Sequence, residues 1–293
     1  MNRKTIGLVS LIVLLIAGII GFLWFYNSYY LPGKRIENTY IEVYQDVDPS
    51  DIGTIWIDTI DHKVVIKPSD DEKVKISYFQ KIDNSNSFTI SNHTVRLWMI
   101  EKAEDLENIF YQNSRPIDTI TIYIPQGSYL SFKNDTVGGS LTVRDVRLKD
   151  LQAGSVGGPV VLENAEINHI KLDINYGGIT VTNCQFQMMD INAVTGECRV
   201  SLPDSLSLYN LNLHTSYGTL SVNNERVHEI INETDVIVNR LERNVGAEKN
   251  IIISSVRSII NVTTVEVYEE PPVDNPEENP EQNTDENKEK GSQ

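Results

Sequence analysis

The sequence has few cysteines and no excess of positive charge, and each shortage excludes a class of protein. Two cysteines in 293 residues, Cys184 and Cys198, are too few for a disulfide framework and lack the paired spacing of a zinc site. We expect both to be small buried residues of the core, with a disulfide between them as the alternative. The formal net charge of −16 argues against a nucleic-acid partner, because phosphate contacts need lysines and arginines on one face.

Catalytic and cofactor-binding motifs are also missing. The histidines show no metal-ligand spacing, and no serine stands in the Gly-x-Ser-x-Gly setting of a nucleophile elbow. Glycine pairs such as Gly177-Gly178 run into alternating apolar residues, whereas a phosphate loop needs a following helix or a Lys-Ser/Thr pair. We therefore predict a protein that is not an enzyme, with no catalytic residue, no cofactor and no metal.

One long hydrophobic run is present, from Thr5 to Tyr26. It carries no charge, and at about 1.5 Å of rise per residue it is long enough to cross a bilayer core of about 30 Å. Arg3 and Lys4 precede it, and aromatic residues gather at its far end. We expect residues 1–30 to form an uncleaved transmembrane anchor with a short cytoplasmic N-terminus. A cleaved signal peptide is the alternative, but the run is too long and no small-residue cleavage site follows.

The flanking charges predict the orientation of this anchor. Arg3, Lys4 and the N-terminal amine outnumber Lys34 and Arg35, which favours an N-terminus inside the cell. We expect a single-pass protein of the cytoplasmic (inner) membrane whose C-terminal part lies in the periplasm or at the cell surface. Residues 31–51 are predicted to be a linker and N-terminal cap.

The C-terminal segment 269–293 differs in composition from the rest. It is rich in Pro, Glu and Asn and has one aliphatic residue, Val273. Such a segment cannot bury enough apolar surface to offset the entropy lost on folding. We therefore predict a disordered acidic tail.

Residues 52–268 alternate apolar and polar residues and contain an internal repeat. The first apolar residue after each glycine group recurs every 19 residues, and a further copy follows after 22, at Leu141, Val160, Ile179, Cys198 and Leu220. Glycine stands two residues before each of these positions, and Asp or Asn stands four residues after most of them. A weaker copy near the C-terminus has Ser258 in place of the glycine and Ile260 in the apolar position.

A repeat of this length is too short for a propeller blade or a helical hairpin and is typical of one coil of a solenoid. The glycine column predicts a bend that needs positive φ or close backbone approach, and the Asp/Asn column predicts a second bend with stacked side chains. We predict an all-β fold, a single-stranded parallel β-solenoid of about nine coils, with right-handed winding expected.

One segment, 80–115, departs from the repeat and is predicted to be an excursion from the coils. Within it, Glu101–Asn113 has apolar residues at helical spacing, which predicts a short helix. Exposed aromatic residues can anchor a partner, so Trp98, Phe110 and Tyr111 are the candidate partner-binding residues. The alternative is that these three side chains pad or cap the solenoid.

The coil pattern G-x-apolar-x-apolar-x-N, as in "GGITVTN" and "GPVVLEN", follows an N-terminal anchor. In this it resembles the bacterial Toastrack-type adhesin family, β-helical domains of unknown function in envelope proteins. The resemblance covers roughly residues 52–267. It implies a parallel β-helix in an extracytoplasmic location, and it implies no catalytic residues.

Together these observations favour a non-catalytic, membrane-anchored β-solenoid outside the cytoplasm, acting as a binding, adhesin-like or scaffold module of the bacterial envelope. Its partners would be the lipid bilayer, through the N-terminal helix, and an envelope protein or glycan. One alternative is a cytoplasm-facing solenoid that assembles end to end. The other is a carbohydrate-active β-helix enzyme, which would need two carboxylates within about 10 Å on one face.

Overall fold

The computed structural model describes residues 15–26, 40–81, 87–99, 110–111, 115–155, 157–227 and 237–264. Residues 15–25 form a helix. Within the described ranges, no helix combines the length and the apolar character that crossing a membrane requires. The rest of the predicted span Thr5–Tyr26, and the predicted acidic tail 269–293, lie outside the described residues.

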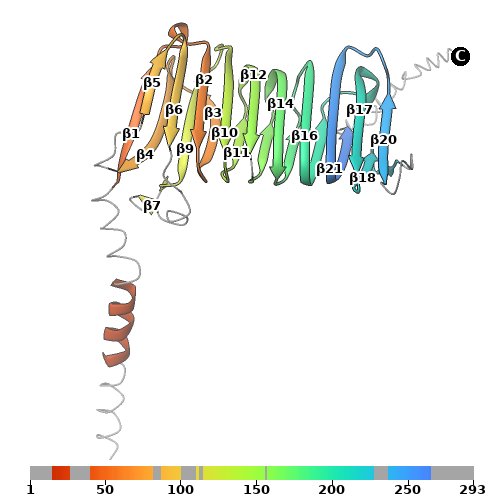
Figure 1. Cartoon of the computed structure of the whole chain (residues 1–293). Coiled ribbons are helices and arrows are strands. Elements are labelled where there is room, and N and C mark those ends of the chain that lie inside the picture. The colour runs from red at the N-terminus through yellow and green to blue at the C-terminus, as the bar shows by residue number, and fades with distance from the viewer. Residues whose placement is uncertain are drawn as a thin grey trace, which may run out of the picture.

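The coils stack into a rod (Figure 1). On one side of it, called the first side, all neighbouring coil strands are parallel. Along the rod these strands are β6 (Thr94–Met99), β2 (Thr54–Thr59), β10 (Leu130–Thr136), β12 (Arg147–Ser155), β14 (Glu166–Tyr176), β16 (Met188–Leu202), β21 (Lys249–Thr264) and β17 (Tyr209–Ser216). Successive side chains of a strand point to opposite faces, so Ile55 and Ile57 enter the core while Trp56 faces outward.

A second side is built from shorter parallel strands. In the same order they are β9 (Thr119–Pro125), β3 (Lys63–Ser69), β11 (Leu141–Arg144), β13 (Val160–Glu163), β15 (Ile179–Thr182), the second halves of β16 and β21, and β18 (Thr219–Val222). Buried aliphatic residues from both sides meet in one continuous core. The predicted parallel β-solenoid is confirmed, and the 19-residue spacing sets the register of its central coils.

The coils do not stack in sequence order at either end of the rod. The described residues form eight coils, ordered β6/β9, β2/β3, β10/β11, β12/β13, β14/β15, β16, β21 and β17/β18. Ile260 lies beside Cys198, and Leu220 lies beside Ile260, so β21 is inserted between β16 and the coil that follows β16 in the chain. The 22-residue step from Cys198 to Leu220 therefore does not join two coils that stack on each other.

The predicted excursion 80–115 also contains part of the solenoid. β6 stacks on β2 and belongs to a coil, because its residues Val95, Leu97 and Met99 alternate into the core. In the described part of this segment, β5 (Ser87–Ser91) lies outside the coil, and so does the connection from β6 to β9 where the structure describes it. In its described part, β7 (Phe110–Tyr111) pairs with β8 (Arg115–Pro116). The predicted helix is thus wrong at Phe110–Tyr111, and all its other residues lie outside the described ranges.

Antiparallel strands cover both ends of the rod (Figure 1). At one end β5 (Ser87–Ser91) pairs with β6, β4 (Val74–Lys81) pairs with β9, and β1 (Tyr40–Val47) pairs with β4. At the other end β20 (Val238–Arg243) pairs with β17, and β19 (Glu225–Arg226) pairs with β18. Short 3-10 turns lie before β2 and β17, as η2 (Pro49–Asp51) and η4 (Leu206–Leu208). The end coils therefore do not present bare parallel edges to another rod.

Two ladders of stacked residues at the bends account for the glycines and the Asp/Asn residues that recur in each repeat. At the first bend, Gly177 has φ 133°, and a Cβ there would stand 2.2 Å from the carbonyl oxygen of Gly158 in the coil beneath. Only glycine fits such stacking, as predicted. At the second bend, Asn183 Nδ2 donates to Asn164 Oδ1 at 2.9 Å, and Asn164 Nδ2 donates to Asp145 Oδ1 at 3.2 Å. All three polar residues have positive φ, which confirms the predicted Asp/Asn column.

Candidate binding surface

Trp56 stands on the outer face of β2 between cationic side chains of the two neighbouring strands. The register places Arg96 of β6 beside it on one flank and Lys133 of β10 on the other. The Arg96 guanidinium carbon and Lys133 Nζ each lie 4.1 Å from the centroid of the indole ring. These are cation–π contacts. Because the cations approach from opposite strands, they fix the orientation of the indole.

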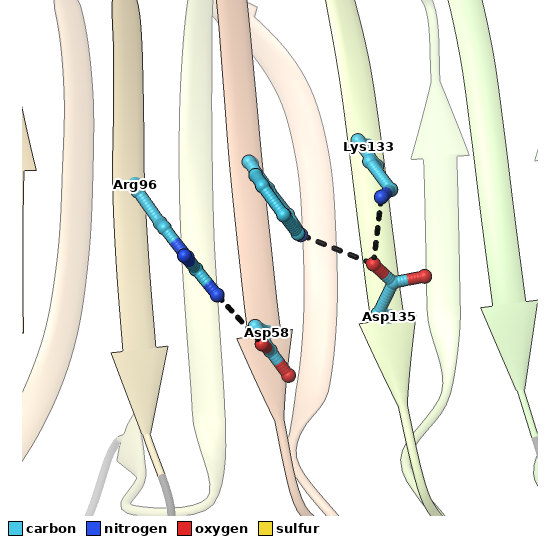
Figure 2. Close-up of polar contacts among 5 residues, drawn as sticks. Asp58, Arg96, Lys133 and Asp135 are labelled. Atoms are coloured by element: carbon cyan, nitrogen blue, oxygen red, sulfur yellow. Dashed lines mark hydrogen bonds and ion pairs between the residues drawn. The ribbon is translucent and has the colours of Figure 1, made fainter. Parts of the chain in front are cut away.

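Two aspartates complete this arrangement (Figure 2). Figure 2 shows Arg96 pointing toward Asp58 and Lys133 pointing toward Asp135; in each pair the nitrogen lies 3.2 Å from Oδ2. Trp56 Nε1 donates a hydrogen bond to Asp135 Oδ2 at 3.1 Å. We call these five residues the Trp56 cluster. Its two positive and two negative charges cancel, and its members come from three adjacent strands.

Of the predicted partner-binding residues, the structure places Trp98 beside the cluster. Trp98 lies on the outer face of β6, is 46% exposed, and is in register with Asp58. Phe110 and Tyr111 lie in β7, and their side chains are outside the described part of the structure. Trp98 is therefore grouped with the Trp56 cluster.

The outer face of the next coils carries the three residue types of a hydrolase triad, but in an unproductive order. Ser131 Oγ donates to Asp150 Oδ2 at 2.9 Å, and His169 Nδ1 lies 2.7 Å from Asp150 Oδ1. In a triad the imidazole stands between serine and carboxylate and takes the serine proton. Here the carboxylate stands in the middle. Burial raises the pKa of Asp150, but the hydrogen bonds from His169 and Ser131 outweigh it and hold that pKa below its ordinary value.

A family model described as Toastrack DUF4097 matches residues 52–237, which is more than half of the chain. The chain belongs to the Toastrack DUF4097 family. The resemblance carried by the "GGITVTN" pattern is thereby confirmed, and the matched region begins just before β2 and ends just before β20.

Two solved structures share a coarse likeness with this Toastrack chain. One, described as a putative cell adhesion protein from Clostridium sporogenes, has 15% identity and a TM-score of 0.39, over 77% of this chain and 100% of that chain. The other, described as a putative lipid binding protein from Parabacteroides distasonis, has 11% identity and a TM-score of 0.26, over 77% and 97%. Neither likeness carries a functional argument. A comparison with curated proteins finds no match.

The Toastrack solenoid also has a shallow cleft of about 340 Å³, lined by Tyr129, Glu166, Gln185, Gln187 and Lys249 among others. In this cleft Lys249 Nζ donates to Gln185 Oε1 at 3.1 Å, and Glu166 Oε1 lies 3.0 Å from Arg147 Nη2. In the ranges that the structure describes, no cluster of His, Cys, Asp or Glu is arranged to hold a metal ion.

The two cysteines are free and buried, so the predicted core role is confirmed and the disulfide alternative was wrong. Burial raises the pKa of both thiols, that of Cys198 to about 12. A buried thiol with a raised pKa is a poor nucleophile. Neither cysteine is therefore part of a reactive site.

Sequence reasoning did not find the Trp56 cluster. A signal for its outward orientation was present, since Trp56 lies between Ile55 and Ile57, and Arg96 lies between Val95 and Leu97. The signal for its assembly was not, because β6, β2 and β10 neighbour one another out of sequence order. Spacing along the chain cannot show which outward residues share a row.

Proposed function

We propose that this Toastrack chain is a membrane-anchored, non-catalytic binding module that holds a β-solenoid outside the cytoplasm in the bacterial envelope. The hydrophobic run Thr5–Tyr26 with Arg3 and Lys4 before it supports the anchor and its orientation. The rod would then carry its outer faces away from the membrane-bound N-terminus, toward proteins or glycans of the envelope.

The observation that carries the binding role is the Trp56 cluster with Trp98 beside it. Large aromatic side chains on an exposed face, with ion pairs around them, are the groups that dominate recognition surfaces. A solenoid core does not need an outward tryptophan, because the core is filled by inward residues such as Ile55 and Ile57. The cluster therefore favours a surface that binds a partner.

The structure provides one argument against end-to-end assembly and a separate one against a carbohydrate-active enzyme. End-to-end assembly on the cytoplasmic side is disfavoured by the antiparallel strands β4, β5, β19 and β20, which occupy positions where another coil would stack.

A carbohydrate-active enzyme needs two carboxylates, and Asp58 and Asp135 are register neighbours on adjacent strands. Each is paired with a cation, however, whereas glycoside cleavage needs one carboxyl group that carries a proton.

Protease protection tests the location. In spheroplasts treated with external proteinase K, we expect the solenoid to be cut at its loops or released from the anchor, while a cytoplasmic marker protein stays intact. After lysis, both should be accessible. A body that survives external protease, while a known outside-facing protein is digested, would contradict the proposed function.

A further inference from the structure

The outer face of the first side has a row of short residues that ends at Trp98. From β6 to β14 the row is Trp98, Asp58, Asp135, Gly154 and Asp173, each in register with the next. Trp98 is the one large side chain of this row, and it is 46% exposed. Two carboxylates thus follow the exposed indole along the rod, Asp58 on the next strand and Asp135 on the strand after it, with about 4.8 Å between neighbouring strands.

In the part of the chain that the structure describes, each of the two carboxylates has one oxygen, Oδ1, that takes part in no side-chain hydrogen bond or ion pair. Within the described part of the chain, the hydrogen bonds and ion pairs to Asp58 and Asp135 all reach Oδ2. A Cβ at Gly154 would lie 3.2 Å from Asp135 Oδ1, so this oxygen points toward the position where glycine leaves out a side chain. Each ionised carboxylate accepts up to about four hydrogen bonds. Asp58 is the register neighbour of Trp98, and Asp135 Oδ1 lies one strand further along the rod, on the side toward Gly154. The acceptors therefore follow the indole along the rod.

The charges of the cluster restrict the class of ligand. Arg96 and Lys133 already neutralise Asp58 and Asp135, so a cationic ligand gains little there. An anionic ligand would meet the carboxylates, and their open oxygens accept hydrogen bonds but donate none. A neutral ligand rich in hydroxyl groups satisfies both conditions, since it can donate to the oxygens and pack its C–H groups against the indole.

We infer that Trp98, together with the Oδ1 atoms of Asp58 and Asp135, forms a binding surface for a neutral glycan. One sugar ring lies against the Trp98 indole, and hydroxyl groups of this ring and of the sugars that follow it along the row donate hydrogen bonds to Asp58 and Asp135. The Trp56 cluster holds these carboxylates in place from the side. This inference rests on the proposed function, because envelope glycans reach the surface only if the solenoid lies outside the cytoplasm.

The test uses the full chain in a detergent without a sugar headgroup, so that the detergent does not compete for the site. Cellohexaose and chitohexaose are the neutral probes, and polygalacturonate is the anionic comparison. We expect at least one neutral probe to bind and to change the intrinsic indole fluorescence. Trp98→Ala should weaken that binding at least tenfold. The control Tyr176→Ala, which removes a 60% exposed aromatic residue on β14, should bind as the unaltered chain does.

Thermal unfolding of Trp98→Ala checks that this variant is folded. The fluorescence titration of the unaltered chain tests the inference even if the variant does not fold. The inference is overturned if neither neutral probe binds at millimolar concentration, if Trp98→Ala binds as tightly as the unaltered chain, or if polygalacturonate binds more tightly than the neutral probes. Protease protection in spheroplasts is independent of these titrations. If the solenoid proves to lie on the cytoplasmic side but still binds cellohexaose or chitohexaose through Trp98, the proposed location is wrong and the glycan-binding surface stands.

Discussion

Lys249 Nζ lies 2.6 Å from Asp204 Oδ2, and this ion pair joins the first residue of β21 to the turn that follows β16. Lys249 also donates to Gln185 Oε1 at 3.1 Å, and the Tyr209 hydroxyl donates to Asp204 Oδ2 at 3.1 Å. β21 is the last strand along the chain that the structure describes, but it lies between β16 and β17. The pair thus ties the inserted strand to both coils that it separates.

Removing this pair is expected to destabilise the C-terminal coils. The hydrogen bond from Lys249, together with its charge, holds the pKa of Asp204 below its ordinary value of 3.8. The stabilisation is therefore complete above pH 3.8 and is lost as the pH falls through the lower pKa of the folded state. Asp204→Asn should cost about 1 kcal/mol at pH 7, measured by urea unfolding.

The pH dependence separates this effect from general damage. The difference between Asp204→Asn and the unaltered chain should shrink as the pH is lowered through the folded-state pKa. Asp70 is exposed, so Asp70→Asn is the matched control and should change the free energy of unfolding little, both at pH 7 and at acid pH. An Asp204→Asn deficit that stays constant down to the acid limit of folding would contradict the assigned role of Lys249.

Glycine at the first bend should be irreplaceable. Gly177→Ala introduces a Cβ 2.2 Å from the Gly158 carbonyl oxygen at a φ of 133° and should cost about 3 kcal/mol or more in unfolding free energy. Gly157 has open space around its Cβ position, so Gly157→Ala should fall within about 0.5 kcal/mol of the unaltered chain. Equal effects of the two substitutions would show that the coils do not stack glycine on glycine.

The second bend can be separated into backbone and side-chain contributions. Asn164 has φ 50° and bonds both to Asp145 and to Asn183. Asn164→Ala should lose about 1–2 kcal/mol, because it removes the ladder bonds and strains the backbone. Asn164→Gly loses the same bonds but accepts positive φ, so it should be the more stable variant in thermal unfolding. The reverse order would mean that the backbone conformation is not strained for alanine.

The central coils could be predicted from the sequence because every repeat carries the same bend residues. Gly177, Ile179, Val181 and Asn183 occupy positions that recur in the coils on either side, and residues in one frame stack by register alone. The order of the end coils could not be predicted this way. Ile260 and Leu220 both fit the apolar position beside Cys198, and the choice depends on the turns and hairpins that hold β17 and β21.

The candidate surface could be predicted only in part, for the same physical reason. Trp98 was found because an exposed aromatic residue is visible in the sequence, but its grouping with Phe110 and Tyr111 came from closeness in the chain. The structure puts Trp98 in register with Asp58, and places Trp56 between side chains from two other strands. Rows on the outer face follow coil order, which sequence spacing does not give when coils are inserted.

The location of the solenoid is the central claim, and the buried cysteines allow it to be measured directly. Cys184 and Cys198 are free but buried, so a folded chain should give almost no background with a membrane-impermeant maleimide. Tyr176→Cys places one reactive thiol at a 60% exposed position of β14. We predict that this variant is labelled in intact spheroplasts to the same extent as after lysis, and that the unaltered chain is not labelled. Labelling of Tyr176→Cys only after lysis would place the rod in the cytoplasm and contradict the account.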